Sequence, residues 1–152
     1  MSTVTVRSEI AAPVARVFQL FTDVEHSARN VSGIKKIEML TPGGFELGTR
    51  WRETREVLGP ADSAEMEVTS FEQNRNYTIT HHKGGVRIDT AFLFEPLGDH
   101  TKVSVEFELQ TDGVPPGLLA PFNWAIAGKV REIIGHDLAD LKGSLENVTP
   151  AT

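Results

Sequence analysis

The stretch PPGLLAPFNWAIAGKVREIIGHDLADLKGSLENV, residues 115–148, predicts one long helix at the end of the chain. Its apolar residues recur at steps of three and four, the period of a single helix face. At ~1.5 Å per residue, about 32 residues would span roughly 48 Å. No other segment keeps this period for so long, so we expect the helix to lie across a sheet. The apolar face consists of Leu119, Phe122, Ile126, Val130, Ile133, Ile134, Leu138, Leu141, Leu145 and Val148.

The rest of the chain has the patterns of that sheet. Residues 3–10 alternate as a half-buried strand, and Pro13 stands where it can begin a short helix. Asp23 is expected to cap a second short helix that ends near Asn30. Further strands are expected over residues 33–40, 49–57, 63–72, 77–82, 86–95 and 101–110, and their short connections impose antiparallel neighbours.

The predicted fold class is therefore α+β. A strongly curved antiparallel sheet of about seven strands would wrap around the C-terminal helix, with two short helices after the first strand. Gly128 and Gly135 interrupt the long helix, where they permit either a bend or a close backbone approach. Trp124 lies off its apolar stripe, so it either packs under a loop or rims an opening.

Composition limits the classes of function. The chain has 152 residues, no cysteine and a net charge of −6, and we expect one domain over residues 1–152. The lack of cysteine excludes disulfides and thiol nucleophiles and fits a cytoplasmic location. The negative charge argues against a nucleic-acid partner. We see no signal peptide and no apolar run of membrane-spanning length, so no integral membrane association is expected.

Several segments resemble the START-like, or SRPBCC, superfamily with its helix-grip fold, especially the polyketide cyclase/dehydrase branch. They are residues 10–18 (IAAPVARVF), 32–40 (SGIKKIEML), 48–53 (GTRWRE) and the closing helix. The resemblance implies an apolar cavity between sheet and helix that takes lipids, polyketides, sterols or similar molecules. The chain departs from the pattern at residues 26–30, where members often carry Trp or Pro, and this leaves the shape of the cavity mouth open.

Glu53 and Arg55 are the sharpest candidates for polar groups in such a cavity. They share a strand face with Trp51 and Val57, because side chains two apart point the same way. If that face is inward, a carboxylate and a guanidinium are buried and must be paired. They would then anchor a ligand or act as an acid/base group. The alternative is that the face is reversed, or that both charges reach solvent at a sheet edge.

Tyr77 and His81 form the second candidate pair, on one face of a strand with Ile79. His81 would be a hydrogen-bond partner or general base inside the cavity, or a half-buried histidine near a strand end. Thr90 is a hydroxyl on an apolar face, and such groups more often bond to a nearby backbone carbonyl than to a ligand. No histidine spacing suggests a metal site, so we expect no metal and no cofactor.

We therefore expect a protein that binds a hydrophobic small molecule, such as a lipid, a polyketide or an aromatic compound. The alternative is a cyclase, dehydratase or aromatase that uses the same cavity, and no catalytic residue can be assigned. A third hypothesis is an interaction protein, for example a homodimer, that uses an exposed apolar rim. The expected ligand-binding residues are Trp51, Glu53, Arg55, Met66, Tyr77, Ile79, His81, Thr90, Phe92, Phe107, Phe122, Ile126 and Val130.

Overall fold

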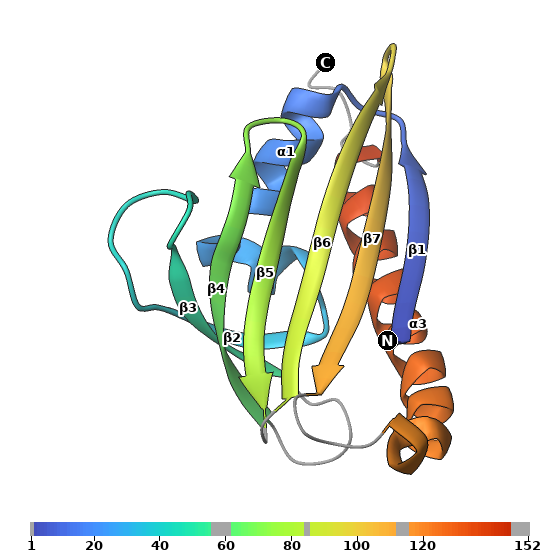
Figure 1. The fold of residues 1–152 in the computed structure, drawn as a ribbon. Helices are drawn as coiled ribbons and strands as arrows, with labels where there is room; N and C mark the ends of the chain where they lie inside the picture. The colour runs from blue at the N-terminus through green and yellow to red at the C-terminus, as the bar shows by residue number, and fades with distance from the viewer. Residues whose placement is uncertain (1, 56–61, 84–85, 112–115, 147–152) are drawn as a thin grey trace.

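The computed structural model describes residues 2–55, 62–83, 86–111 and 116–146, with the side chains of 2, 62, 83, 111 and 116–126 left out. It has the predicted α+β architecture, a curved antiparallel sheet with its helices on one side (Figure 1). The strands are β1 (Ser2–Ile10), β2 (Ile34–Met39), β3 (Arg50–Arg55), β4 (Asp62–Glu72), β5 (Asn76–Lys83), β6 (Val86–Leu97) and β7 (His100–Thr111). The helices are α1 (Val14–Thr22), the 3₁₀ turn η1 (Val24–His26), α2 (Ser27–Asn30) and α3 (Pro116–Glu146).

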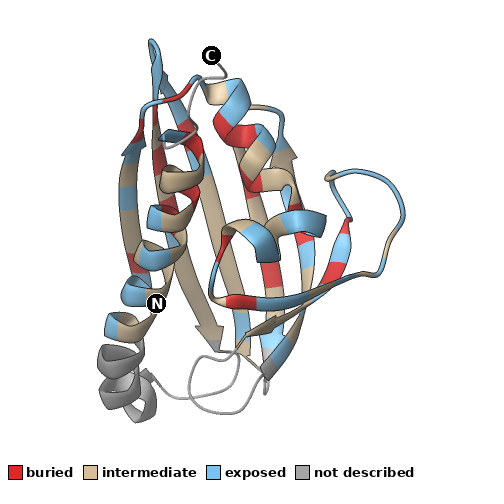
Figure 2. Cartoon of the chain, turned by 180° about the vertical axis from the view of Figure 1, so that it is seen from behind, coloured by how far each residue is buried: buried red, intermediate tan, exposed pale blue. Residues whose placement is uncertain are grey.

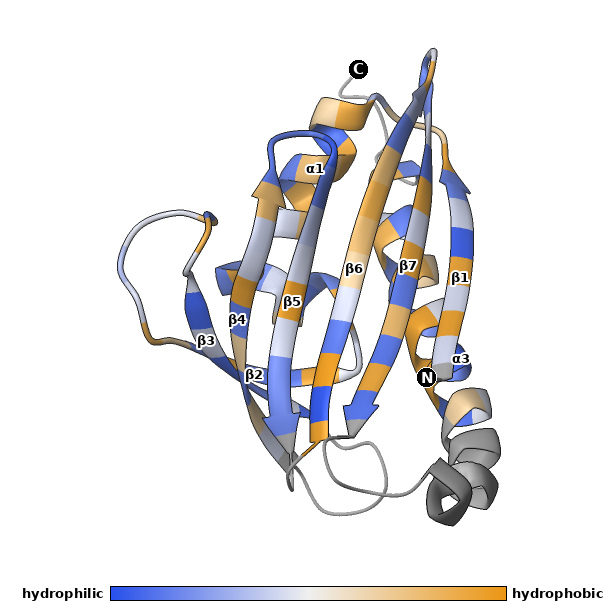
Figure 3. Cartoon of the chain, in the orientation of Figure 1, coloured by the Kyte–Doolittle hydropathy of each residue, from blue (hydrophilic) through white to orange (hydrophobic). Residues whose placement is uncertain are grey.

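The sheet places its first strand beside its last strand. Its order is β1-β7-β6-β5-β4-β3-β2, so five consecutive pairs form a meander and β1 is added beside the last strand. Ile10 lies opposite Thr101, and Val4 lies opposite Phe107. The hydrophobic and hydrophilic residues alternate along β6 and β7 (Figure 3), as expected for a sheet with only one covered face.

The predicted strands and the long helix are confirmed, with shifted ends. The expected strand 49–57 is seen as Arg50–Arg55, and Val57 lies outside the described residues, as do Pro115 and Val148. The predicted cap at Asp23 is wrong, since its side chain caps no helix N–H. The Asp23 carboxylate instead lies 3.0 Å from the His26 ring, because the first turn after it is 3₁₀.

Aromatic side chains from α1 and the sheet form the centre of the core. Phe18 is 2% exposed, and its ring centroid lies 5.1 Å from that of Phe94 and 5.8 Å from that of Tyr77. Tyr77 also stacks on Phe92 at 4.7 Å. These rings lie on the sheet face that α1 covers, so burial is greatest beside α1 (Figure 2).

The second half of α3 is fastened to β1 and to the residue after it. Near its end, the Ala11 N–H donates to Glu146 at 2.7 Å, and Lys142 donates to the Glu9 carbonyl at 2.5 Å. Further back, Arg131 donates to the Thr5 carbonyl at 3.3 Å. The α3 residues buried against the core are Leu138, Leu141 and Leu145. Among the helices of the described residues, none is long and apolar enough to cross a membrane.

Gly135 gives a test of the helix interior. A Cβ built on Gly135 or Gly128 meets no atom within 4 Å, so close approach does not explain either glycine. Gly135→Ala is expected to raise the free energy of unfolding by about 1 kcal/mol, because alanine favours helix and restricts the unfolded chain. Urea unfolding measures the change. Gly33→Ala is the control and should give no gain, because its Cβ would lie 3.2 Å from an Arg55 nitrogen.

Candidate functional site

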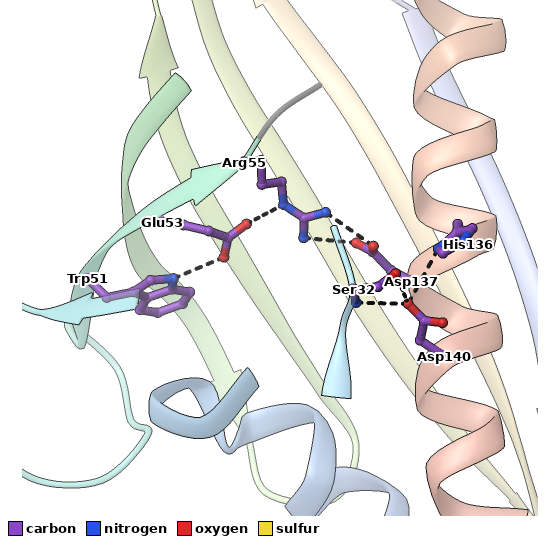
Figure 4. Close-up of polar contacts among 7 residues, drawn as sticks. All are labelled: Ser32, Trp51, Glu53, Arg55, His136, Asp137 and Asp140. Atoms are coloured by element: carbon purple, nitrogen blue, oxygen red, sulfur yellow. Dashed lines mark hydrogen bonds and ion pairs between the residues drawn. The ribbon is translucent and has the colours of Figure 1, made fainter. Parts of the chain in front are cut away.

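A chain of polar side chains runs along the helix-facing side of β3 (Figure 4). The Trp51 indole N–H donates to Glu53 Oε1 at 3.3 Å, and Arg55 Nε donates to Glu53 Oε2 at 2.7 Å. Trp51 is 1% exposed, while the side chains of Glu53 and Arg55 are 11% and 20% exposed. The face that carries Trp51 therefore points inward, and both charges are paired, as burial requires.

The chain ends on α3, at a residue that the sequence reading missed. Asp137 accepts from Arg55 Nη1 at 3.1 Å, and its other oxygen lies 2.9 Å from Nη2. This two-pronged contact joins the guanidinium to a residue 82 positions away. A signal was present, because Asp137 lies three residues after Ile134 and four before Leu141, on the apolar face of the helix. A carboxylate on that face requires a partner.

Two carboxylates share one guanidinium in this group. Burial alone would lower the pKa of Arg55, but the charge of Glu53 and the contacts with Asp137 outweigh it and raise that pKa. Arg55 is thus cationic at every ordinary pH. Burial raises the pKa of Asp137, and the negative charge of Glu53 adds to this, although Arg55 partly offsets both. The group of Glu53, Arg55 and Asp137, which we call the β3–α3 ion triad, carries one excess negative charge when all three are ionised.

The segment between α2 and β2 covers one side of the triad. Gly33 packs so closely that an added Cβ would lie 3.2 Å from Arg55 Nη1 and 3.7 Å from Asp137 Oδ1. Beside it, Ser32 donates to Asp140 Oδ2 from its backbone N–H at 3.0 Å and from its hydroxyl at 2.9 Å. The glycine in the SGIKK segment therefore allows the backbone to pass over the ion triad (Figure 4).

A serine, a histidine and an aspartate do come together here, but their order does not activate a nucleophile. His136 Nδ1 and both Ser32 donors converge on the same oxygen of Asp140, with the His136 contact at 3.3 Å. A nucleophilic triad needs the histidine between the serine and the acid. With Asp140 in the middle, the serine hydroxyl donates its hydrogen bond to the carboxylate and not to the imidazole. This cluster fastens α3 to the segment before β2.

The contacts of Asp140 predict a pH-dependent contribution to stability. Burial opposes its ionisation, but the two hydrogen bonds from Ser32 and the contact with His136 together lower the pKa of Asp140. A carboxyl whose pKa is lowered by folding stabilises the fold above its unfolded pKa, and the contribution is lost as the pH falls through the folded pKa. Asp140→Asn is therefore expected to lose about 1 kcal/mol at pH 7, a small value because the side chain is partly solvated.

The measurement is urea unfolding of both proteins between pH 3 and pH 7. The difference between wild type and Asp140→Asn should shrink toward the acid end, where the wild-type carboxyl is protonated. A difference that is constant across this range would contradict the assignment, because it would then come from shape and not from charge.

The remaining candidates lie on the inner face of the sheet, at different depths. The register places Tyr77 opposite Phe92, Ile79 opposite Thr90, and His81 opposite Ile88, so all share the helix-facing side. Tyr77 is 2% exposed among the aromatic rings, where its hydroxyl lies 3.5 Å from the Phe21 carbonyl and burial raises its pKa. Ile79 and His81 are half-buried.

Thr90 differs from the expectation that its hydroxyl bonds to a backbone carbonyl. The Thr90 hydroxyl has no hydrogen-bond partner among the described residues. In that part of the chain every buried polar side-chain atom has a partner, so this hydroxyl is not fully buried. The Thr90 hydroxyl is therefore accessible from the inner side of the sheet. The other expected lining residues are half-buried, namely Met66, Phe92, Phe107 and Val130. The side chains of Phe122, Trp124 and Ile126 are not among those that the structure describes.

Burial on the inner face falls toward one end of the molecule. Along β7, Val103 and Val105 are 0% exposed, whereas Phe107 and Leu109 are only half-buried. Along β6, Phe94 is buried, whereas Phe92, Thr90 and Ile88 are half-buried. On α3, Leu138, Leu141 and Leu145 are buried, whereas Val130, Ile133 and Ile134 are half-buried. Sheet and helix thus lose burial toward the same end (Figure 2). No group of three potential metal-ligating residues occurs in the described part of the chain.

Solved structures with this fold come from several bacteria. TTHA0849 from Thermus thermophilus is 19% identical, with a TM-score of 0.78, and the match covers 97% of this chain and 99% of that one. A START superfamily protein from Mycobacterium smegmatis is 20% identical, with a TM-score of 0.77 and the same coverage. The Zhui aromatase/cyclase from Streptomyces sp. R1128 is 16% identical, with a TM-score of 0.79 and coverage of 95% and 93%. At these identities the likeness shows the fold, a START-like helix-grip.

The sequence itself carries the family. Residues 1–146 match the family described as "Polyketide cyclase / dehydrase and lipid transport", and the chain belongs to it. The resemblance seen in the sequence motifs is thereby confirmed. A comparison with curated protein sequences gives no match.

Proposed function

We propose that this protein binds a hydrophobic small molecule between the curved sheet and α3. One observation carries the proposal: the apolar inner faces of β6, β7 and α3 lose burial together toward one end of the molecule. Two apolar surfaces that face each other gain free energy by excluding water, at roughly 25 cal/mol per Å². Surfaces left half-buried in this way are suited to an apolar ligand.

The polar groups nearby fit such a site. Ligand pockets are mostly apolar and contain a few polar groups that orient the ligand. Here these groups would be the Thr90 hydroxyl and the β3–α3 ion triad. The apolar contacts would come from the half-buried residues Met66, Ile79, Phe92, Phe107 and Val130, with Phe122 and Ile126 kept as proposed contacts; Trp51 and Tyr77 would support the wall from behind.

The test is binding of N-phenyl-1-naphthylamine, a neutral apolar dye that fluoresces in apolar surroundings. We expect saturable binding, and Thr90→Phe should weaken it at least about tenfold because a ring would fill the inner space. Thr78→Phe is the matched control, since Thr78 lies on the neighbouring strand and faces the opposite side of the sheet. No saturable binding, or equal effects of both substitutions, would overturn the proposal.

An enzyme in the same cavity is the second candidate, and the ion triad favours it. Asp137, whose pKa is raised by burial, lies beside a permanently cationic Arg55, so a carboxyl group suited to acid/base chemistry and an electrophilic group are adjacent. Such a pair suits cyclisation or dehydration of a carbonyl substrate. The enzyme hypothesis is supported if the wild-type protein converts a poly-β-ketone and Asp137→Asn loses this turnover but still binds the dye. It is refuted if the wild-type protein releases the substrate unchanged.

Three further expectations are also proposals. They are that residues 1–152 form one domain, that the protein is cytoplasmic, and that it forms a homodimer. Limited proteolysis, localisation of a tagged chain and light scattering test them in turn.

A further inference from the structure

We infer that the polar end of the proposed cavity selects neutral or cationic amphiphiles that donate a hydrogen bond, and disfavours organic anions. The inference rests on the proposed function and adds the charge class of the ligand. It comes from the excess negative charge of the β3–α3 ion triad, in which Glu53 and Asp137 flank a single guanidinium.

The hydrogen-bond inventory points the same way. Arg55 uses Nε on Glu53 and both terminal nitrogens on Asp137, so three of its five N–H groups are engaged. Each carboxylate oxygen has one donor, Trp51 for Glu53 Oε1 and Arg55 for the other three, and keeps a lone pair free. A ligand therefore meets acceptors in place of an available guanidinium fork. A hydroxyl or amine can bond to them, whereas a carboxylate or sulfonate is repelled.

The triad lies between β3 and α3, on the inner side of the sheet. Gly33 packs against it, since an added Cβ would lie 3.2 Å from Arg55 Nη1. Glu53 lies opposite Ala64, the β4 neighbour of the half-buried Met66 on the same face. In this low-dielectric position one unit charge acts far more strongly than on the surface. Among the described residues, no lysine and no second arginine is buried beside the triad to offset it. Tyr77 and His81 are the other titratable groups that the register places on the inner face of β5.

The experiment compares a neutral and an anionic dye that share one ring system and differ by a single sulfonate group. N-Phenyl-1-naphthylamine is neutral, and 8-anilinonaphthalene-1-sulfonate is the same ring system with one sulfonate. At pH 8 the wild-type protein should bind the neutral dye at least about tenfold more tightly than the anionic one. Glu53→Gln and Asp137→Asn each remove one negative charge and should shift this ratio toward the anion by about tenfold.

The control is Glu106→Gln, which changes the net charge equally but lies exposed on the outer face of β7. It should leave the ratio unchanged. Circular dichroism first confirms that each variant is as folded as wild type, because the anionic dye also binds the exposed apolar surface of partly unfolded protein. Equal binding of the two dyes by wild type, or equal shifts in the three variants, would overturn the inference while leaving the proposed function intact. Failure of the neutral dye to bind at all would overturn both.

Discussion

Arg55→Met is expected to lower the free energy of unfolding by about 3 kcal/mol at pH 7. The substitution keeps an unbranched apolar stem but removes the guanidinium, which leaves Glu53 and Asp137 close together in a mostly buried position without a counter-ion. Breaking one member out of a buried ion pair costs about 3 to 5 kcal/mol, because the remaining charge stays desolvated. We place the value at the lower end because the three side chains retain 11–21% exposure.

Arg52→Met on the same strand is the matched control. Arg52 points to the opposite face, is 48% exposed and lies 3.5 Å from the equally exposed Glu38. Exposed pairs contribute less than about 1 kcal/mol, so this variant should unfold close to wild type. Urea unfolding of both variants gives the comparison. Similar losses in the two, or a loss below about 1 kcal/mol in Arg55→Met, would show that the ion triad is not buried as described.

Phe18→Ala is expected to have an effect of similar or larger size, a loss of about 3 to 5 kcal/mol. Phe18 is 2% exposed and its ring touches those of Phe71, Tyr77 and Phe94, with centroids 5.1–5.9 Å apart. Truncation removes these contacts and leaves a void that rigid neighbouring rings fill poorly. Leu93→Ala, at a leucine that is 41% exposed, should change stability by no more than about 0.5 kcal/mol. Guanidinium unfolding with tryptophan fluorescence as readout measures both, and equal losses would contradict the assigned core.

The fold was predictable because its signals are local. Alternation marks each strand, short turns make neighbours antiparallel, and an apolar stripe over 30 positions marks α3. The error at Asp23 has the same origin. An aspartate before a helix usually caps it, but here the helix begins with a 3₁₀ turn and the carboxylate contacts His26. Sequence pattern does not distinguish these two first turns.

The candidate site was predictable only in part. The pairing of Glu53 with Arg55 follows from their spacing, but both faces of β3 carry charged residues, so the sequence could not decide which face is inward. The contact that decides it comes from Asp137, 82 residues away. The sequence places this carboxylate on an otherwise apolar helix face, but its partner depends on how α3 crosses the sheet. The lack of a hydrogen bond at Thr90 likewise depends on how the side chains around it pack, which the sequence does not show.

The pairing of β1 with β7 has a consequence for synthesis on the ribosome. Residues 2–10 can form their strand ladder only after residues 101–109 have been synthesised. The Ala11 N–H finds its partner Glu146, and the Glu9 carbonyl its partner Lys142, later still. The nascent chain therefore carries an N-terminal segment without these hydrogen-bond partners until residue 146 has emerged. Contacts of such long sequence separation slow folding and expose the growing polypeptide to chaperones and proteases.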